Sequence, residues 1–178
     1  MSRKSFVLVP SLIVTLLGVA RSADLGPMSG IDYQKLGGTW YEVARLPNKR
    51  QRGLSNVTHS FCVDKENVTL ISQGTKKRGR VVRVQGKGRL PKQGSSAAFK
   101  LKFYGLVSFD YNIVECDTRD YQYAVVSAEE GKYLWILSRS PQIDERSYST
   151  ALSRLDQRGF PISALERTAQ SGCAVAQQ

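Results

Sequence analysis

Short segments rich in β-branched and aromatic residues recur from residue 39 onward, at intervals of roughly ten residues. Clusters of Gly, Pro, Asn and Asp separate these segments, and this punctuation is typical of β-sandwiches and β-barrels. We expect eight strands, near residues 39–47, 57–64, 68–75, 80–90, 97–104, 109–116, 121–128 and 132–139.

The links between these segments are short. Residues 65–67 and 129–132 have tight-turn compositions, and residues 91–96 form a longer loop. Short links favour antiparallel pairing of successive strands, and an eight-stranded meander protects its edges best by closing into a barrel. We therefore predict an all-β fold, an eight-stranded antiparallel up-and-down β-barrel.

The residues after the eighth segment change from the period of a strand to the period of a helix. Apolar residues with helical spacing are Ile143, Tyr148, Leu152 and Leu155. Asp144 suits the first turn, and Gly159 suits the position that follows a helix. We predict one C-terminal α-helix that ends near Arg158 and packs outside the barrel, and a short ninth strand near residues 164–169.

The start of the chain has the layout of a secretory signal peptide. Arg3 and Lys4 precede an apolar run over residues 6–20, and small residues follow it. The alternative is an uncleaved membrane anchor, which needs about 20 apolar residues. This run is 15 residues long and contains Pro10, so cleavage is the favoured interpretation.

These observations predict three parts: a signal peptide over residues 1–22, a barrel domain over residues 23–170 and a C-terminal tail over residues 171–178. No cysteine lies near the expected cleavage site to accept the lipid of a bacterial lipoprotein. We expect an exported protein, periplasmic or secreted, that has no outer-membrane lipid anchor.

The chain contains three cysteines, Cys62, Cys116 and Cys173. In an oxidising compartment they allow one disulfide and one free thiol. We expect Cys173 to take part in the disulfide because the tail needs fastening, and either Cys62 or Cys116 can be its partner. No CxxC pair is present and His59 is the only histidine, so no metal site is predicted.

In the segment GGTWYEVARLP, residues 37–47, large side chains occur at both even-numbered and odd-numbered positions. Side chains alternate between the two faces of a strand. One face is therefore expected to carry Trp40, Glu42, Ala44 and Leu46. The other face is expected to carry Thr39, Tyr41, Val43 and Arg45. One face should point into the barrel, and the other should meet a covering element such as the helix.

Three stretches together resemble the motifs of the lipocalin family. They are YQKLGGTWYEVARLP (33–47) with the following NKRQRGLSNVTHSF (48–61), DTRDYQYAVV (117–126) and YLWILSRSP (133–141). Their order and spacing agree over residues 31–170. The sequences WYEVAR and YLWILSR are most similar to the subgroup of bacterial outer-membrane lipocalins and apolipoprotein D. The resemblance implies a calycin-type barrel and the transport or storage of lipid in the cell envelope.

The resemblance also implies that Arg139, in the third motif, packs across Trp40, in the first. A closed barrel makes the first and eighth strands neighbours, so these two residues lie at the same end. Stacking of a guanidinium on an indole contributes about 0.5–2 kcal/mol. We expect Gly38, Trp40 and Arg139 to close the barrel floor as structural residues.

Alternate loops of an up-and-down barrel share an end, so residues 47–54, 75–80, 104–109 and 128–131 should ring the open mouth. The first two loops supply a basic rim, which comprises Lys49, Arg50, Arg52, Lys76, Lys77, Arg78 and Arg80. The third loop is apolar and contains Tyr104, Leu106, Val107 and Phe109. Clustered positive charge raises the local concentration of anions, so this mouth suits an anionic amphiphile. The alternative is that these cations are ordinary solvated surface charges.

Parity along the last strand indicates which side chains face the lumen. If Arg139 lies inside at the floor, then Leu137, Trp135 and Tyr133 share its face. Phe61 matches the position of a pocket aromatic residue in the lipocalins. The predicted ligand-binding residues are Phe61, Phe103, Tyr111, Tyr133, Trp135, Leu137 and, as a buried polar group, Glu42. A barrel of about eight strands holds one small ligand or is filled by side chains.

No catalytic motif of the GxSxG, HExxH or phosphate-loop type is present in the sequence, so we expect neither enzyme activity nor a cofactor. The net charge of +11 raises the question of nucleic acid. No RNA-binding aromatic motif or helix-turn-helix pattern accompanies this charge, so no nucleic-acid partner is expected.

The sequence therefore favours a carrier of a small hydrophobic or amphipathic ligand. We expect an anionic lipid, such as a fatty acid or lysophospholipid, with its acyl tail in the barrel and its head at the basic rim. A peripheral contact with a membrane is a further expectation. The alternative is a barrel filled by its own side chains that acts as a protein-interaction module through its basic face.

Overall fold

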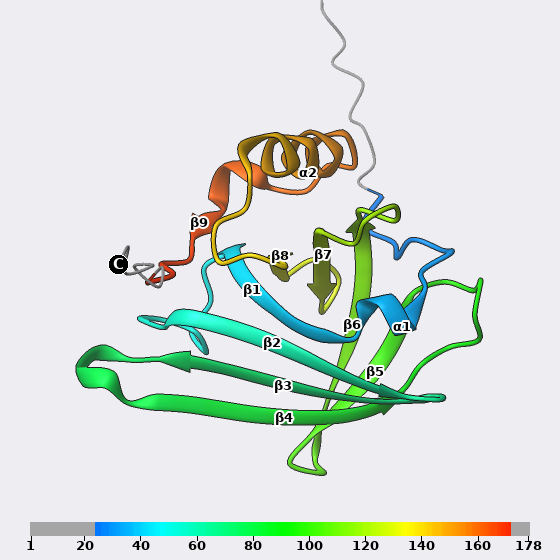
Figure 1. Ribbon diagram of the computed structural model, residues 1–178, viewed down its shortest axis with the longest axis horizontal. Helices are drawn as coiled ribbons and strands as arrows, with labels where there is room; N and C mark the ends of the chain where they lie inside the picture. Colours follow the sequence, from blue (N-terminus) through cyan, green and yellow to red (C-terminus); the bar gives the residue numbers. More distant parts are fainter. Residues whose placement is uncertain (1–23, 172–178) are drawn as a thin grey trace, which may run out of the picture.

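The computed structural model of the protein describes residues 24–171 (Figure 1). The expected signal peptide and Cys173 lie outside the described residues. The strands are β1 (Gly38–Arg45), β2 (Ser55–Asp64), β3 (Asn67–Thr75), β4 (Val81–Arg89), β5 (Ala98–Phe103), β6 (Val107–Cys116), β7 (Tyr123–Ala128), β8 (Tyr133–Ser138) and the short β9 (Glu166–Arg167). The helices are α1 (Tyr33–Leu36), α2 (Glu145–Gln157) and the 3₁₀ turns η1 (Lys77–Gly79) and η2 (Ile162–Ala164).

Strands β1 to β8 form a closed antiparallel barrel. Each strand pairs with the next along the chain, and β1 pairs with both β8 and β2. The expected fold class is confirmed, and every expected strand end lies within two residues of the observed one. The short ninth strand pairs with β1 at Ala44 and Arg45.

The helix α2 packs outside the barrel, as expected, and covers one side of it (Figure 1). Asp144 caps its first turn by accepting a hydrogen bond from the amide of Ser147 at 2.9 Å. Ala151 and Leu155 of α2 are fully buried in an apolar cluster that includes outward-facing residues of β6, β7 and β8. This cover explains why almost every residue of β7 and β8 is buried, whichever face it occupies.

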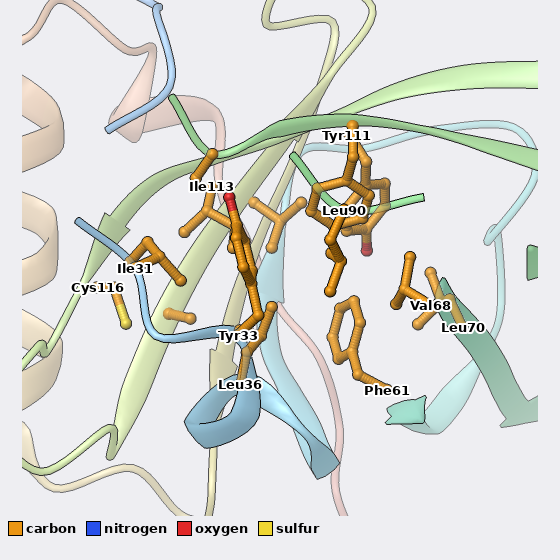
Figure 2. Close-up of a cluster of buried hydrophobic side chains, with 14 of the residues drawn as sticks. Ile31, Tyr33, Leu36, Phe61, Val68, Leu70, Leu90, Tyr111, Ile113 and Cys116 are labelled. Atoms are coloured by element: carbon orange, nitrogen blue, oxygen red, sulfur yellow. The ribbon is translucent and has the colours of Figure 1, made fainter. Parts of the chain in front are cut away.

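A second apolar cluster fills the closed half of the barrel. Figure 2 shows Ile31, Tyr33 and Leu36, from α1 and the segment before it, facing Phe61 and Ile113 from the barrel wall. Helix α1 begins at the cap residue Asp32 and acts as the plug of this end. The core therefore lies at the α1 end and leaves the opposite end open.

A β-bulge in β1 reverses the expected alternation. Glu42 pairs with Leu137 of β8, but the next paired residue is Ala44, so Val43 is an extra residue. After the bulge, Ala44 packs in the outer cluster under α2, whereas Arg45 is 7% exposed and contacts Glu42 inside the barrel. The expectation that Ala44 points inward with Glu42, and Arg45 away from it, is therefore wrong.

The end of the described chain fills a gap between β1 and β2. Residues 168–171, which we call the C-terminal strap, lie where these two strands diverge. The side chain of Gln170 donates hydrogen bonds to the carbonyls of Glu42 in β1 and Val57 in β2, at 2.8 and 2.9 Å. The strap also accepts a main-chain bond from Asn56 of β2 at 2.8 Å. The strap thus completes the barrel wall at this seam.

Within the part of the chain that the structure covers, Cys62 is exposed, Cys116 is buried, and the two are not bonded to each other. The disulfide expected for Cys173 stays a prediction. None of the described helices is long and apolar enough to cross a bilayer. Residues 24–171 also contain no group of three or more His, Cys, Asp or Glu side chains arranged to hold a metal ion.

Candidate functional site

A cavity of about 220 Å³ opens at the end of the barrel opposite α1. Its aliphatic lining consists of Leu54, Val57, Leu70, Val82, Val84 and Val107. Drug-sized ligands occupy pockets of about 300–1,000 Å³. The smaller volume here suits one slim chain or a small ring system.

An aromatic wall forms one side of this cavity. The indole of Trp135 stacks with two tyrosine rings and is nearly parallel to both: Tyr111 at 5.7 Å and 19°, and Tyr133 at 5.7 Å and 9°. Phe109 meets Tyr133 edge-on at 6.4 Å, and Phe103 meets Phe109 edge-on at 5.6 Å. These contacts hold the rings in place, so the wall offers a preformed apolar surface.

Arg50 lies at the mouth, directly above the aromatic wall. Its guanidinium carbon is 4.6 Å from the ring centre of Phe109, and its Nε donates to the hydroxyl of Tyr133 at 3.3 Å. Arg50 is the one member of the basic rim that also lines the cavity. Its position places a cation where the cavity meets solvent.

The other members of the basic rim lie outside the cavity lining. Most are exposed, and Lys76 is half-buried. The pairing of Ser55 with Thr75 holds the two loops that carry them next to each other. No member of the basic rim forms an ion pair with any residue between 24 and 171.

A buried polar layer borders the cavity on the side of β1 and β2, where Gln51 and His59 line it. Its centre is the carboxylate of Glu42, which is 0% exposed. The groups that hydrogen-bond this carboxylate come from four side chains, at 2.7–3.0 Å: Arg45, Gln51, His59 and Thr168. The amide oxygen of Gln51 also accepts from the indole nitrogen of Trp135 at 2.7 Å, so the layer is joined to the aromatic wall.

This environment changes the acidity of Glu42. Burial by itself would raise its pKa, but the hydrogen bond and charge of His59, with the hydrogen bonds of Arg45 and Thr168, bring the pKa below its usual value. Glu42 is therefore a carboxylate that the fold holds in its charged form.

Ser72, His59 and Glu42 form a hydroxyl, imidazole and carboxylate sequence. Ser72 Oγ is 2.8 Å from His59 Nδ1, and His59 Nε2 is 3.0 Å from Glu42 Oε2. A serine nucleophile also needs N–H donors for the oxyanion. Ser72 lies in the middle of β3, which pairs with β2 on one side and β4 on the other, so the strand ladders engage the neighbouring main-chain amides. The arrangement is therefore a structural network rather than an assembled hydrolytic site.

Tyr111 carries a hydroxyl group that no other residue between 24 and 171 hydrogen-bonds. Its ring lines the cavity, its side chain is buried, and its hydroxyl has no hydrogen-bond partner among the described residues. Burial, and secondarily the charge of Glu42, raise the pKa of Tyr111, so the hydroxyl stays protonated. It can donate a hydrogen bond to a molecule in the cavity.

The structure separates the predicted ligand-binding residues into three groups. Phe103, Tyr111, Tyr133 and Trp135 line the cavity. Phe61 and Leu137 belong to the inner apolar cluster and are not part of the lining. Glu42 lies in the polar layer behind Gln51 and His59. The parity argument thus found the inward face, but it did not indicate how deep along the axis the cavity extends.

The predicted floor residues lie together at the closed end. The guanidinium carbon of Arg139 is 3.7 Å from the ring centre of Trp40, and the Trp40 indole nitrogen donates to Leu36 of α1 at 2.8 Å. Gly38 has φ of 94°, and a side chain there would approach Arg139 to 3.2 Å. Glycine is therefore suited both to the backbone conformation and to the space.

Several cavity residues escaped the sequence analysis, mainly Asn48, Gln51, His59 and Ser72. His59 shares the face of Phe61 on the second strand, so parity could have placed it inside. Gln51 lies in a loop, where no periodic signal exists. Two hydrogen bonds to Asn48 hold it in position: the main-chain amide of Gln51 donates to the Asn48 side chain, and the Asn48 side chain donates to the side-chain oxygen of Gln51.

A second hollow, of about 760 Å³, is broader and shallower. Exposed residues of β5 and β6 form much of it, including Lys100 and Asp110, which pair at 3.6 Å. It does not reach the aromatic wall, and we assign no ligand to it.

Comparison with known proteins identifies a family and related structures with this fold. The family described as a lipocalin-like domain matches residues 31–170. The outer membrane lipoprotein Blc of Citrobacter freundii is 31% identical over 171 residues, which cover 92% of this chain and 96% of that protein. Apolipoprotein D of Mus musculus is 20% identical over 154 residues, covering 80% of this chain and 78% of that protein. Insecticyanin from the tobacco hornworm Manduca sexta has the same fold, with a TM-score of 0.68 at 15% identity over 85% of this chain and 87% of its own.

Proposed function

The chain belongs to the lipocalin family, whose members bind small hydrophobic ligands, and we propose that it carries a single-chain anionic lipid in its barrel. A fatty acid or a lysophospholipid has the required chemistry. The observation that carries this proposal is an apolar cavity, open at one end, with Arg50 at its mouth, a cation that has no ion-pair partner among residues 24–171.

The proposed orientation has the acyl tail against the aromatic wall and the anionic head beside Arg50. Each buried methylene contributes about 0.8 kcal/mol, so the tail supplies most of the affinity. The remaining basic rim raises the local concentration of anions at the mouth and thereby the rate of capture. The hydroxyl of Tyr111 can donate a hydrogen bond to a polar group on the acyl tail, away from the head group.

We place this activity outside the cytoplasm, as storage or transport of lipid in the cell envelope or the extracellular space. The layout of residues 1–22 and the name of the bacterial relative support export. The proposed partners are the lipid itself and, peripherally, a membrane that supplies or receives it. The cavity favours this function over a filled barrel that only binds proteins.

Lipid extraction and mass spectrometry of the purified protein test the proposal. We expect a co-purified single-chain lipid, and displacement of a fluorescent fatty acid by the extracted species. A protein that is empty and that binds no fatty acid, lysophospholipid or fatty alcohol in displacement assays would overturn the proposal.

Substitution of Arg50 tests the orientation. We expect Arg50→Gln to weaken binding of a fatty acid by about tenfold, because a charge-assisted contact is lost, with little effect on the fatty alcohol of the same length. Lys92→Gln removes one positive charge at the closed end and is the matched control. Equal weakening of acid and alcohol would contradict the placement of the head group at Arg50.

A further inference from the structure

The connection between β5 and β6 exposes apolar side chains at the open end of the barrel. Leu106 is 89% exposed, Tyr104 is 73% exposed and Val107 is 44% exposed. Val81, at the start of β4, is 64% exposed. These four are the exposed large apolar side chains of the region 24–171, and such side chains are rarely grouped on a soluble protein without a partner.

The connection is a tight, ordered turn. Phe103 pairs with Val107, and the amide of Leu106 donates to the carbonyl of Phe103 at 3.1 Å. Tyr104 and Gly105 both have positive φ, 52° and 72°, as this sharp reversal requires. The side chain of Leu106 is therefore held outward by the backbone, and the turn projects from the barrel on the side away from α2 (Figure 1). We call residues 104–107 the apolar tip.

Positive charge lies at the same opening. Tyr104 and Val107 line the cavity mouth together with Arg50 and with Val82, which follows Val81. Four members of the basic rim, Lys76, Lys77, Arg78 and Arg80, immediately precede Val81 in the chain. They have no ion-pair partner within the described chain, as noted above. The acidic residues of the mouth are Glu129 and Glu130, on the β7–β8 loop, and Glu129 pairs with Lys132.

An apolar projection at the same opening as cations that have no ion-pair partner among residues 24–171 matches one kind of surface, a bilayer that contains anionic lipids. Cationic side chains are attracted to anionic headgroups, and exposed apolar side chains gain by entering the acyl boundary beneath them. An acidic protein surface would satisfy the cations but would leave Leu106 without an apolar environment. The combination therefore favours a lipid surface over a protein partner.

We propose that the open end of this protein docks on anionic membranes, with the apolar tip inserted and the basic rim on the headgroups. The cavity mouth then faces the bilayer, so a lipid can pass between membrane and barrel without crossing bulk water. The proposal rests on the proposed function for the nature of the transferred lipid, but the docking itself does not require an occupied cavity.

Flotation with vesicles tests the docking. The wild-type protein should bind vesicles that contain phosphatidylglycerol, bind phosphatidylcholine vesicles weakly, and dissociate as salt screens the charges. Leu106→Asp should lower the partition coefficient by about tenfold or more, because it removes one inserted apolar side chain and adds a negative charge. The control Lys92→Asp also places an aspartate on a loop, but at the closed end, and should retain most of the binding.

Insertion is measured separately with Leu106→Trp. The emission of this tryptophan should shift to the blue on anionic vesicles and should be quenched by brominated acyl chains, relative to the wild-type protein. Failure of the wild-type protein to bind anionic vesicles, or equal binding by Leu106→Asp and the wild-type protein, would overturn the proposal.

Displacement of a fluorescent fatty acid in vesicle-free solution separates this proposal from the proposed function. Leu106 does not line the cavity, so Leu106→Asp should bind the soluble probe as the wild-type protein does. Probe binding without vesicle binding would reject the docking alone. Vesicle binding without probe binding would reject the proposed carrier function and leave the docking in place.

Discussion

Trp40 and Trp135 lie in the same barrel but in different surroundings. Trp40 is fully buried at the closed end between Arg139 and α1, whereas Trp135 lines the cavity. We expect Trp40→Ala to lower the free energy of unfolding by about 3–5 kcal/mol, as for other large core truncations. Urea denaturation measures this change.

The same substitution at Trp135 should act mainly on binding. Trp135→Ala enlarges a space that already exists, so its cost in stability should be smaller, while removal of the stacked indole weakens binding of an acyl chain. Titration with a fluorescent fatty acid measures the affinity. If both variants lost the same stability and the same affinity, this division between floor and cavity would be wrong.

The buried carboxylate of Glu42 makes stability depend on pH. Removing one partner of a buried charged network costs about 3–5 kcal/mol, so Glu42→Gln should be destabilised by about this amount at neutral pH. The pKa of Glu42 is lower in the folded protein than its usual value of 4.5. Its contribution is therefore complete above that value and is lost as the pH falls through the lower, folded pKa.

Urea denaturation at several pH values tests this dependence. The difference in stability between the wild-type protein and Glu42→Gln should be constant near neutral pH and should narrow below about pH 4.5, because only the wild-type protein loses this charge. A difference that stays the same at pH 3 and pH 7 would exclude Glu42 as the source.

The two described cysteines should differ in reactivity. Burial, and then the charges of Asp117 and Glu115, raise the pKa of Cys116 to about 12, whereas Cys62 is exposed. Since the thiolate is the reactive form, Cys116 should resist alkylation in the folded protein at pH 8 and react in urea. Peptide mapping after alkylation measures both sites, and rapid native labelling of Cys116 would contradict this expectation. Labelling of Cys62 only after reduction would identify it as the partner of Cys173.

At the scale of single elements, the bulge in β1 shows what alternation can predict. The pattern of GTWYEVAR correctly placed Trp40 and Glu42 on one face, because the strand is regular between these two residues and its side chains alternate there. The extra residue at Val43 leaves no mark in the pattern, since both faces of this strand are buried, one by the lumen and one by α2. Arg45 therefore entered the lumen against expectation, where Glu42 neutralises its charge.

The C-terminal strap was not predictable for a related reason. Its ties to the barrel are main-chain and side-chain hydrogen bonds, which leave no hydrophobic period in the sequence. A short strand was expected near it, but its bonds to both edges of the seam became visible only in three dimensions. The helix α1 is likewise too short, at four residues, for a periodic signal.

Thr168 of the strap tests how strongly the seam is held. Its hydroxyl donates to the carboxylate of Glu42 at 2.8 Å in a buried setting. Thr168→Val keeps the shape and removes this donor, which should lower the free energy of unfolding by about 1–3 kcal/mol. Thr118→Val, on an exposed turn, is the isosteric control and should stay within about 0.5 kcal/mol of the wild-type protein. Equal stability of all three proteins would show that the bond from the Thr168 hydroxyl does not contribute to the stability of the fold.

At the scale of the whole molecule, occupancy of the barrel should appear in its stability. A ligand that binds only the folded state, at a free concentration of about 100 times its Kd, stabilises that state by about 2.7 kcal/mol. We expect a matching fatty acid to raise the Tm in differential scanning calorimetry, and Trp135→Ala to reduce the increase. A Tm that does not respond to any single-chain lipid would indicate a barrel that works without cargo.

The barrel as a whole was predictable because its signals are repeated. Eight segments with turns between them, and a helix of different period, leave few ways to bury all the apolar faces. The position of the cavity along the barrel axis was not predictable. Phe61 and Leu137 lie on the same inward face as Trp135, but they belong to the inner apolar cluster and not to the cavity lining. That position depends on which side chains α1 brings into the lumen.

The seam between β1 and β2 has a consequence for biogenesis. Glu42 in β1 accepts a hydrogen bond from Thr168 in the C-terminal strap, and these residues are 126 positions apart in the chain. The first strand of the barrel therefore cannot form this bond until residue 168 has been synthesised. A chain that is still being synthesised therefore has a gap between β1 and β2. This gap closes only when the C-terminal strap supplies its hydrogen bonds to both strands.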